Sequence, residues 1–294
     1  MKQLLILSGK GGTGKTTVAS AFIELARAKT FADCDVEAPN LHLVTGLAAD
    51  PTSRDFYGLP VASIDPEACI LCGLCQEHCR FDAIRLEDTY IVDPFVCEGC
   101  AVCDYVCPAD AVSMVPAVSG DLMLYKEEDR VFSTARLRMG SGMSGLLVSE
   151  VKKEMRENAV DQAFAIVDGS PGIGCPVIAS LSGADAVLIV AEPSVSGISD
   201  MKRVIDTALK FGVQVAVCVN KFDVNRKMTE KIRLFCEDEG LDFVGTIPFD
   251  PLAVQLVNRG LTIVGETCPS GQAVESIYRK VMDILTEKEA GRKA

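Results

Sequence analysis

The stretch "LSGKGGTGKTT", from Leu7 to Thr17, decides the fold, because it is a glycine-rich phosphate loop placed between a strand and a helix. The apolar run "QLLIL" before it predicts a buried strand, and "TTVASAFIELARAK" after it has the apolar spacing of a helix. Three further β-branched runs, "FAIVD", "AVLIVAE" and "QVAVCVNK", alternate with helical segments downstream. The sequence therefore predicts an α/β fold, a mostly parallel sheet with helices on both faces.

The residue types of the phosphate loop predict a nucleotide site. Its glycines let backbone N–H groups surround phosphate oxygens, and the helix that follows points its positive end toward them. We expect Lys15 to reach the β- and γ-phosphates and the Thr16 hydroxyl to bind Mg²⁺. Lys10 is a second lysine, which one nucleotide in one subunit does not need. The expected nucleotide-binding residues of the loop are Gly9, Gly11, Gly12, Thr13, Gly14, Lys15, Thr16 and Thr17.

Carboxylates end two of the expected strands. Asp168 ends "FAIVD" and is followed by "GSPGIG", whereas Asp33 and Asp35 end the expected second strand in "KTFADCD". The carboxyl ends of parallel strands lie beside the phosphate loop, where Mg²⁺ and the attacking water must be held. We expect Asp168 to serve the Mg²⁺ site and Asp35 to orient the water.

A cysteine-rich internal repeat interrupts the α/β pattern. "IDPEACILCGLCQEHCRFDAI" begins at Ile64 and "VDPFVCEGCAVCDYVCPADAV" begins at Val92, with an offset of 28 at every matched cysteine. Residues 61–117 hold eight of the 13 cysteines and few core-forming residues, so metal must stabilise the unit where apolar burial cannot. The sequence predicts a nucleotide domain made of residues 1–60 and 118–294, with an inserted small α+β domain at 61–117.

The two cysteine runs resemble those of bacterial two-cluster ferredoxins, in which the fourth cysteine of each run binds the other cluster. The resemblance implies two [4Fe-4S] clusters. Two zinc sites are the alternative, but the spacing of the runs suits zinc poorly. The implied ligands are Cys69, Cys72, Cys75 and Cys107 for the first cluster and Cys97, Cys100, Cys103 and Cys79 for the second.

The motifs "GKGGTGKTT", "ADCDVEAPNL", "VDGSPGIG" and "VNKFD" resemble those of the MinD/ParA branch of phosphate-loop ATPases, which includes the Mrp-type iron–sulfur carriers and the nitrogenase iron protein. The resemblance covers residues 1–60 and about 118–294. It implies ATP as the nucleotide, a dimer of the chain with itself or with a close paralogue, and Lys10 reaching the partner subunit's nucleotide. It also implies that Asn220 contacts adenine and that the loop around Pro248 lines the base pocket.

Charge and hydropathy limit the partners. The net charge is −12, and residues 61–117 contribute −8 of it, from ten acids and two arginines. This balance argues against nucleic acid and suits a basic redox protein as partner. No run approaches the roughly 18 apolar residues of a membrane span, and the opening residues do not resemble a signal peptide. We therefore expect a cytoplasmic protein, with the apolar stripe of the last helix packed on the core rather than on a membrane.

Three functions are compatible with these features. The first is an ATPase that couples nucleotide state to electron transfer through two clusters. The second is an ATP-gated carrier or assembly protein for iron–sulfur clusters, but such carriers use a C-terminal C-x-x-C that is absent after Cys107. The third is a MinD- or ParA-like positioning switch, which would have no use for clusters.

Two features of the second half remain open. Cys175, seven residues after Asp168, is either a buried packing residue or a residue near the two-fold axis of a dimer. Near that axis it would respond to nucleotide state, and it would either contact a partner's redox centre or help to hold a cluster at the interface. The other scattered cysteines are expected to be core or surface residues. The segment "STARLRMGSGMSGLLVSEV", residues 133–151, resembles a loop of the family, but Met143 and Leu146 replace its usual Asn and Lys.

Overall fold

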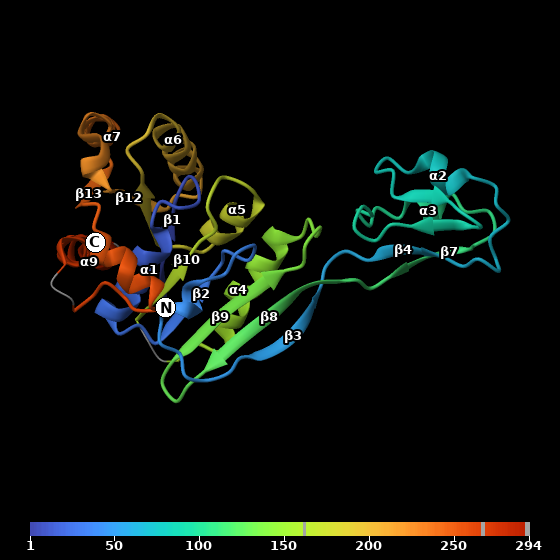
Figure 1. Cartoon of the computed structure of the whole chain (residues 1–294), viewed down its shortest axis with the longest axis horizontal. Helices are drawn as coiled ribbons and strands as arrows, with labels where there is room; N and C mark the ends of the chain where they lie inside the picture. The colour runs from blue at the N-terminus through green and yellow to red at the C-terminus, as the bar shows by residue number, and fades with distance from the viewer. Residues whose placement is uncertain (161–162, 266–267, 292–294) are drawn as a thin grey trace.

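The computed structural model describes residues 1–160, 163–265 and 268–291, and within them it has one large sheet of nine strands (Figure 1). The order is β13-β12-β11-β1-β10-β2-β9-β8-β3. Every pairing from β13 to β9 is parallel, and only β8 and β3 are antiparallel, so the prediction of a mostly parallel α/β sheet is confirmed. The strands are β1 (Lys2–Leu7), β2 (Thr30–Asp33), β3 (Thr52–Tyr57), β8 (Val118–Lys126), β9 (Val131–Leu137), β10 (Phe164–Asp168), β11 (Ala186–Ala191), β12 (Gln214–Asn220) and β13 (Asp242–Ile247).

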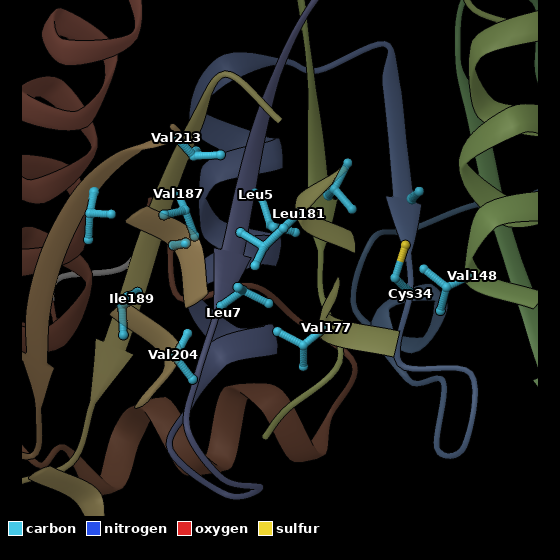
Figure 2. Packing of buried hydrophobic residues seen from close by; sticks show 14 of the residues in the cluster. Leu5, Leu7, Cys34, Val148, Val177, Leu181, Val187, Ile189, Val204 and Val213 are labelled. Carbon is cyan, nitrogen blue, oxygen red and sulfur yellow. The ribbon is translucent and has the colours of Figure 1, made fainter. Parts of the chain in front are cut away.

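Helices cover both faces of this sheet, because successive residues of its strands are apolar on both sides. Leu4 and Ile6 of β1 pack with one group of helices, while Leu5 and Leu7 pack with the other, as Figure 2 shows for the second group. The first face carries α1 (Lys15–Ala26), α8 (Pro251–Asn258) and α9 (Pro269–Gly291). The second carries α4 (Ser144–Glu157), α5 (Cys175–Leu181), α6 (Val195–Lys210) and α7 (Arg226–Asp238).

Three features of the fold bear on the sequence-based expectations. Val274, Ile277 and Val281 of α9 are buried in the core, which confirms the expected packing of the last helix. In the described part of the chain, no helix is long and apolar enough to cross a membrane.

The segment 133–151 is not one loop, because its first five residues belong to β9. Ser133 and Thr134 are polar but buried, so they interrupt the apolar pattern by which a strand is predicted. The strand forms because these residues pair with β2 in the sheet.

The cysteine repeat forms a small unit at the edge of the large sheet. The chain leaves β3 and returns into β8, its antiparallel neighbour, and Figure 1 shows the intervening residues set to one side of the α/β body. Its core is small, with Ala62, Ile84, Tyr90 and Val112 packing around two buried cysteines. The elements of this unit are β4 (Val61–Ile64), α2 (Leu74–His78), β5 (Ile84–Leu86), β6 (Tyr90–Val92), α3 (Val102–Tyr105) and β7 (Val112–Val115).

Candidate functional site

The phosphate loop forms the floor of a cavity of about 800 Å³. The cavity is also lined by Asp35, Asn220, Pro248 and Phe249. Most of the predicted nucleotide-site residues therefore face one space, whereas Gly9, Lys10 and Asp168 lie outside its lining. The loop residues that line the cavity are Gly11, Gly12, Thr13, Gly14, Lys15, Thr16 and Thr17.

Two glycines of the loop are required by its geometry. Gly14 has a φ of 92°, and a Cβ there would lie 2.3 Å from Nδ2 of Asn220. A Cβ on Gly9 would lie 2.4 Å from Cβ of Asp200 on α6. Neither position admits a side chain without displacing its neighbour.

Lys15 and Thr16 both bind Asp168 at the end of β10. The Lys15 ammonium lies 2.5 Å from one carboxylate oxygen of Asp168, and the Thr16 hydroxyl donates to the other at 2.7 Å. Burial of Lys15 lowers its pKa, but Asp168, Asp33 and Asp35 outweigh burial and raise the pKa above its usual value. Lys15 is therefore a fixed positive charge at the loop.

Asp33 and Asp35 have different environments. Asp33 is fully buried and accepts backbone hydrogen bonds from Asp35 at 2.9 Å and from Asn40 and Leu41 at 3.0 Å. Burial, reinforced by Asp168, raises its pKa to about 7. Asp35 is half-buried and faces the cavity, and burial raises its pKa as well. Asp33 thus positions the 35–41 segment, and Asp35 is the carboxylate that a bound ligand can meet.

Two cavities of the small unit each bring four cysteines together. One is lined by Cys69, Cys72, Cys75 and Cys107, and the other is lined by Cys79, Cys97, Cys100 and Cys103. These are the two sets that the ferredoxin resemblance implies, including the exchange of the fourth cysteine. In the residues that the structure describes, no three or more His, Cys, Asp or Glu side chains are arranged around a single metal ion. A cubane cluster makes a different demand, because its four thiolates bind four separate iron atoms.

The backbone of the two cysteine loops follows the same repeat. Leu71 and Gly99, which are 28 residues apart, have φ values of 58° and 66°, and Gly73 and Ala101 have values of 83° and 60°. Two thiols already accept backbone hydrogen bonds: Ala62 N–H donates to Cys97 at 3.5 Å, and Ala111 N–H donates to Cys107 at 3.3 Å. Such N–H···S bonds help to set the potential of iron–sulfur clusters.

A family model described as the CobQ/CobB/MinD/ParA nucleotide-binding domain matches residues 4–263. The chain belongs to this MinD/ParA family of P-loop ATPases.

Individual proteins resemble this MinD/ParA chain over nearly its whole length. An uncharacterized protein of Methanocaldococcus jannaschii is 29% identical to it and covers 96% of this chain and 97% of its own. An iron–sulfur cluster carrier protein of Pyrococcus furiosus is 25% identical and covers 97% and 87%. The septum site-determining protein MinD of Pyrococcus horikoshii, solved with Mg-ADP, matches with a TM-score of 0.57 at 19% identity, covering 100% of this chain and 98% of that one. The structural match confirms the α/β fold.

The second lysine of this MinD/ParA loop lies away from the cavity. The Lys10 ammonium is 2.6 Å from a carboxylate oxygen of Glu192, which follows β11, and both side chains are about one-third exposed, at 36% and 30%. Lys10 is therefore available at the surface of the subunit, held by an ion pair that solvent can reach.

Cys175 is exposed at the first position of α5, so the alternative of a buried packing residue is wrong. The glycine-containing loop after Asp168 carries the chain to the surface before the helix begins. A Cβ on Gly145, at the start of α4, would lie 3.0 Å from Cβ of Cys175, so the two helix starts are in contact. Core or surface positions were expected for the other scattered cysteines, and the structure places all four of them, Cys34, Cys218, Cys236 and Cys268, in the core.

Around Asn220 and Pro248, where the family resemblance implies the base pocket, the structure adds Lys221, Asp223 and Phe249, which the sequence analysis did not assign. The Asn220 amide donates to the Thr13 carbonyl at 2.7 Å, and Lys221 donates to the Gly12 carbonyl at 3.2 Å. The Asp223 carboxylate accepts from Phe249 N–H at 2.8 Å, which joins the "VNKFD" segment to the loop around Pro248. Residues Asn220 to Asp223 form an N-K-x-D pattern, which resembles a guanine-reading motif. In the structure, Asp223 accepts a backbone hydrogen bond from a distant segment instead, and local sequence does not predict that contact.

Proposed function

We propose that this chain is an ATP-driven, dimeric iron–sulfur protein in which the nucleotide state controls electron transfer through two [4Fe-4S] clusters to a partner protein. The observation that carries the proposal is the presence of two four-cysteine cavities in a unit inserted into a MinD/ParA ATPase. A positioning switch would need the nucleotide cavity alone.

The cysteine cavities fit two clusters in number, pairing and surroundings. Cys69, Cys72, Cys75 and Cys107 would hold one, and Cys79, Cys97, Cys100 and Cys103 would hold the other. When bound, such clusters store and release single electrons. The chain supplies apolar walls, which include Tyr90 and Val112, and the two N–H···S hydrogen bonds that would stabilise thiolate charge.

The nucleotide site fits ATP with Mg²⁺. Lys15 would bind the β- and γ-phosphates, Thr16 would bind Mg²⁺, Asp168 would hold the Mg²⁺ hydration shell, and Asp35 would orient water. Mg²⁺, when bound, neutralises phosphate charge. Because Lys15 is paired with Asp168 in the structure, phosphate binding to Lys15 would compete with that ion pair. Asp168 begins the loop that ends at Cys175, so this competition would act directly on the start of α5.

Contacts between the body and the small unit offer a route for coupling. The start of α5 touches Gly145, and the turn before α4 reaches the second cysteine loop: a Cβ on Gly140 would lie 3.3 Å from the Phe95 ring, and one on Gly142 would lie 3.9 Å from the Glu98 carboxylate. Phe95 and Glu98 flank Cys97. A shift of α5 can therefore be passed through the start of α4 to the loop that would hold the second cluster.

Lys10 fits a role in a dimer, either with a second copy of the chain or with a close paralogue. In the structure its ammonium is paired with Glu192 at 2.6 Å and is partly exposed. In the proposed dimer, Lys10 would exchange this carboxylate for the phosphates of the partner subunit and would add positive charge to the transition state.

A carrier of iron–sulfur clusters is the second candidate, because relatives that cover nearly the whole chain, such as the Pyrococcus furiosus protein, bear that name. The described cysteines after Cys107 argue against a shared surface cluster, since Cys218, Cys236 and Cys268 are buried and only Cys175 is exposed.

One anaerobic experiment tests the proposal. ATP turnover is measured with the clusters oxidised and with the clusters reduced, and cluster loss to an apo-ferredoxin is followed in parallel. Electron-transfer coupling predicts a turnover rate that depends on cluster oxidation state, with iron retained on the chain. Equal turnover in both states, with ATP-dependent loss of iron to the apo-ferredoxin, would replace the proposal with the carrier function.

A further inference from the structure

The two halves of the cysteine repeat differ in what covers them. In the second half, Gly99 lies against the chain that leaves β3: a Cβ there would lie 2.5 Å from the Pro60 carbonyl and 3.0 Å from Cβ of Leu59. The neighbouring Glu98 and Phe95 approach the turn before α4, as described above. Gly99 therefore touches the chain that leaves β3, whereas the Phe95 and Glu98 side chains stay exposed, with Phe95 74% exposed.

The tip of the first cysteine loop points into solvent and is apolar. Ile70 and Leu71, which correspond to Glu98 and Gly99 in the repeat, are 64% and 53% exposed. Leu71 has a φ of 58°, a left-handed conformation that is unfavourable for any residue with a Cβ, and the second half has glycine at this position. Leu71, next to Cys72, thus has a strained backbone and an apolar side chain that is exposed to water. Both features lower the stability of the folded chain, so stability alone does not explain a leucine at this position.

We propose that Ile70 and Leu71 form the docking surface for the electron-transfer partner, and that this partner is a basic redox protein. The inference rests on the proposed function. Residues 61–117 carry ten acids and two arginines, so an apolar contact centred on Leu71 would belong to a unit whose net charge of −8 attracts a positively charged partner. By the repeat, Leu71 occupies the position at which Gly99 touches the chain that leaves β3 in the other half. The first cysteine cavity then faces the partner, and the second faces the ATPase.

The test uses anaerobically purified holoprotein and horse heart cytochrome c, a small basic haem protein, as the probe. Binding of ferricytochrome c to the oxidised holoprotein is measured by calorimetry at low and at high ionic strength. Leu71→Asn and Leu71→Gly remove the apolar side chain, and both residues tolerate a positive φ, so the fold is kept. The matched controls are Leu86→Asn, at an equally exposed position on β5, and Tyr105→Asn, on α3 beside the second cavity.

We expect both Leu71 variants to bind cytochrome c about tenfold more weakly, with the controls within about twofold of the wild type and all affinities falling with salt. Iron content and the rate of electron transfer to benzyl viologen, which needs no docking surface, should stay at wild-type values in every variant. Wild-type affinity in the Leu71 variants, a loss in Tyr105→Asn instead, a change in oligomeric state, or no binding of cytochrome c would each overturn the docking proposal. A wild-type protein without iron, or one that does not reduce viologen, would instead refute the proposed function.

Discussion

The α/β body and the inserted cysteine unit are stabilised in different ways. The body has an apolar cluster on each face of a nine-stranded sheet, whereas the core of the unit contains six buried residues, two of them the cysteines Cys75 and Cys103. A core that small does not stabilise about 57 residues by apolar burial. Under the proposed function, one chain combines a part stabilised by its own apolar core with a part that bound clusters would stabilise, and the predictions below test that contrast.

Removal of iron should have the largest effect and should be confined to the inserted unit. The purified protein is expected to hold about eight iron atoms and eight sulfides per chain, two cubanes. A chelator should then abolish amide-exchange protection in 61–117, while the β1 to β13 strands and ATP binding stay intact, because their core contains no metal ligand. Stoichiometric zinc without broad absorption near 400 nm, or loss of the whole fold on chelation, would contradict this expectation.

Lys15→Ala should abolish nucleotide binding, with a loss of affinity of about a thousandfold, because the variant removes the buried cation that faces the phosphates. It should leave iron content unchanged, since Lys15 and the cysteine cavities lie in different parts of the molecule. Equilibrium binding of a fluorescent ATP analogue, together with an iron assay, measures both. Iron loss in this variant would show that the two regions are not independent.

Lys10→Ala should retain most nucleotide binding but reduce hydrolysis by at least about a hundredfold and prevent ATP-dependent dimerisation, because the role proposed for Lys10 is in the partner subunit. Glu192→Gln is the matched variant, as it releases Lys10 from its ion pair without removing the lysine. Light scattering with and without ATP reports the dimer. A monomeric Lys10→Ala protein that hydrolyses ATP at the wild-type rate would exclude the trans role.

The buried carboxyl of Asp33 should make the stability of the body depend on pH. Its pKa is about 7 in the folded chain, and about 3.9 when unfolded. Between these values the unfolded chain releases the proton and the folded chain keeps it, so this group's contribution to stability falls as pH rises from about 4 to about 7. Urea unfolding of wild type and Asp33→Asn without nucleotide should differ in slope by up to about 1.4 kcal/mol per pH unit in that window. Parallel pH profiles would show that Asp33 is already ionised.

Cys175→Ser should have the smallest effect and bears on the contact between the two regions. Iron should stay at the two-cluster level, because the structure places Cys175 on α5 and not in either cysteine cavity. ATP-linked electron transfer should fall by a small factor, since Cys175 ends the loop that begins at Asp168 and contacts the start of α4. A drop in iron would identify Cys175 as a ligand, and no change in either quantity would leave it without a role in coupling.

Local patterns were sufficient to predict much of the fold. Strands such as β10 and β11 are continuous apolar runs, and the phosphate loop is set by glycines, so each is visible in a few consecutive residues. β3, β8 and β9 were not predicted, because polar residues such as Ser133 and Thr134 lie at buried positions of β9 and the three strands depend on pairing with one another and with β2.

The sequence by itself determined the chemistry that is available: the phosphate loop, the carboxylates at the strand ends, and two cysteine runs with a fixed offset. Only the tertiary structure decided which groups meet. It paired Lys15 with Asp168 across 153 residues, tied Asp223 to Phe249, exposed Cys175, and set Gly99 against the body while leaving Leu71 in solvent. The physical reason is that residue type and spacing act over a few residues, whereas burial, ion pairing and exposure depend on segments brought together by packing.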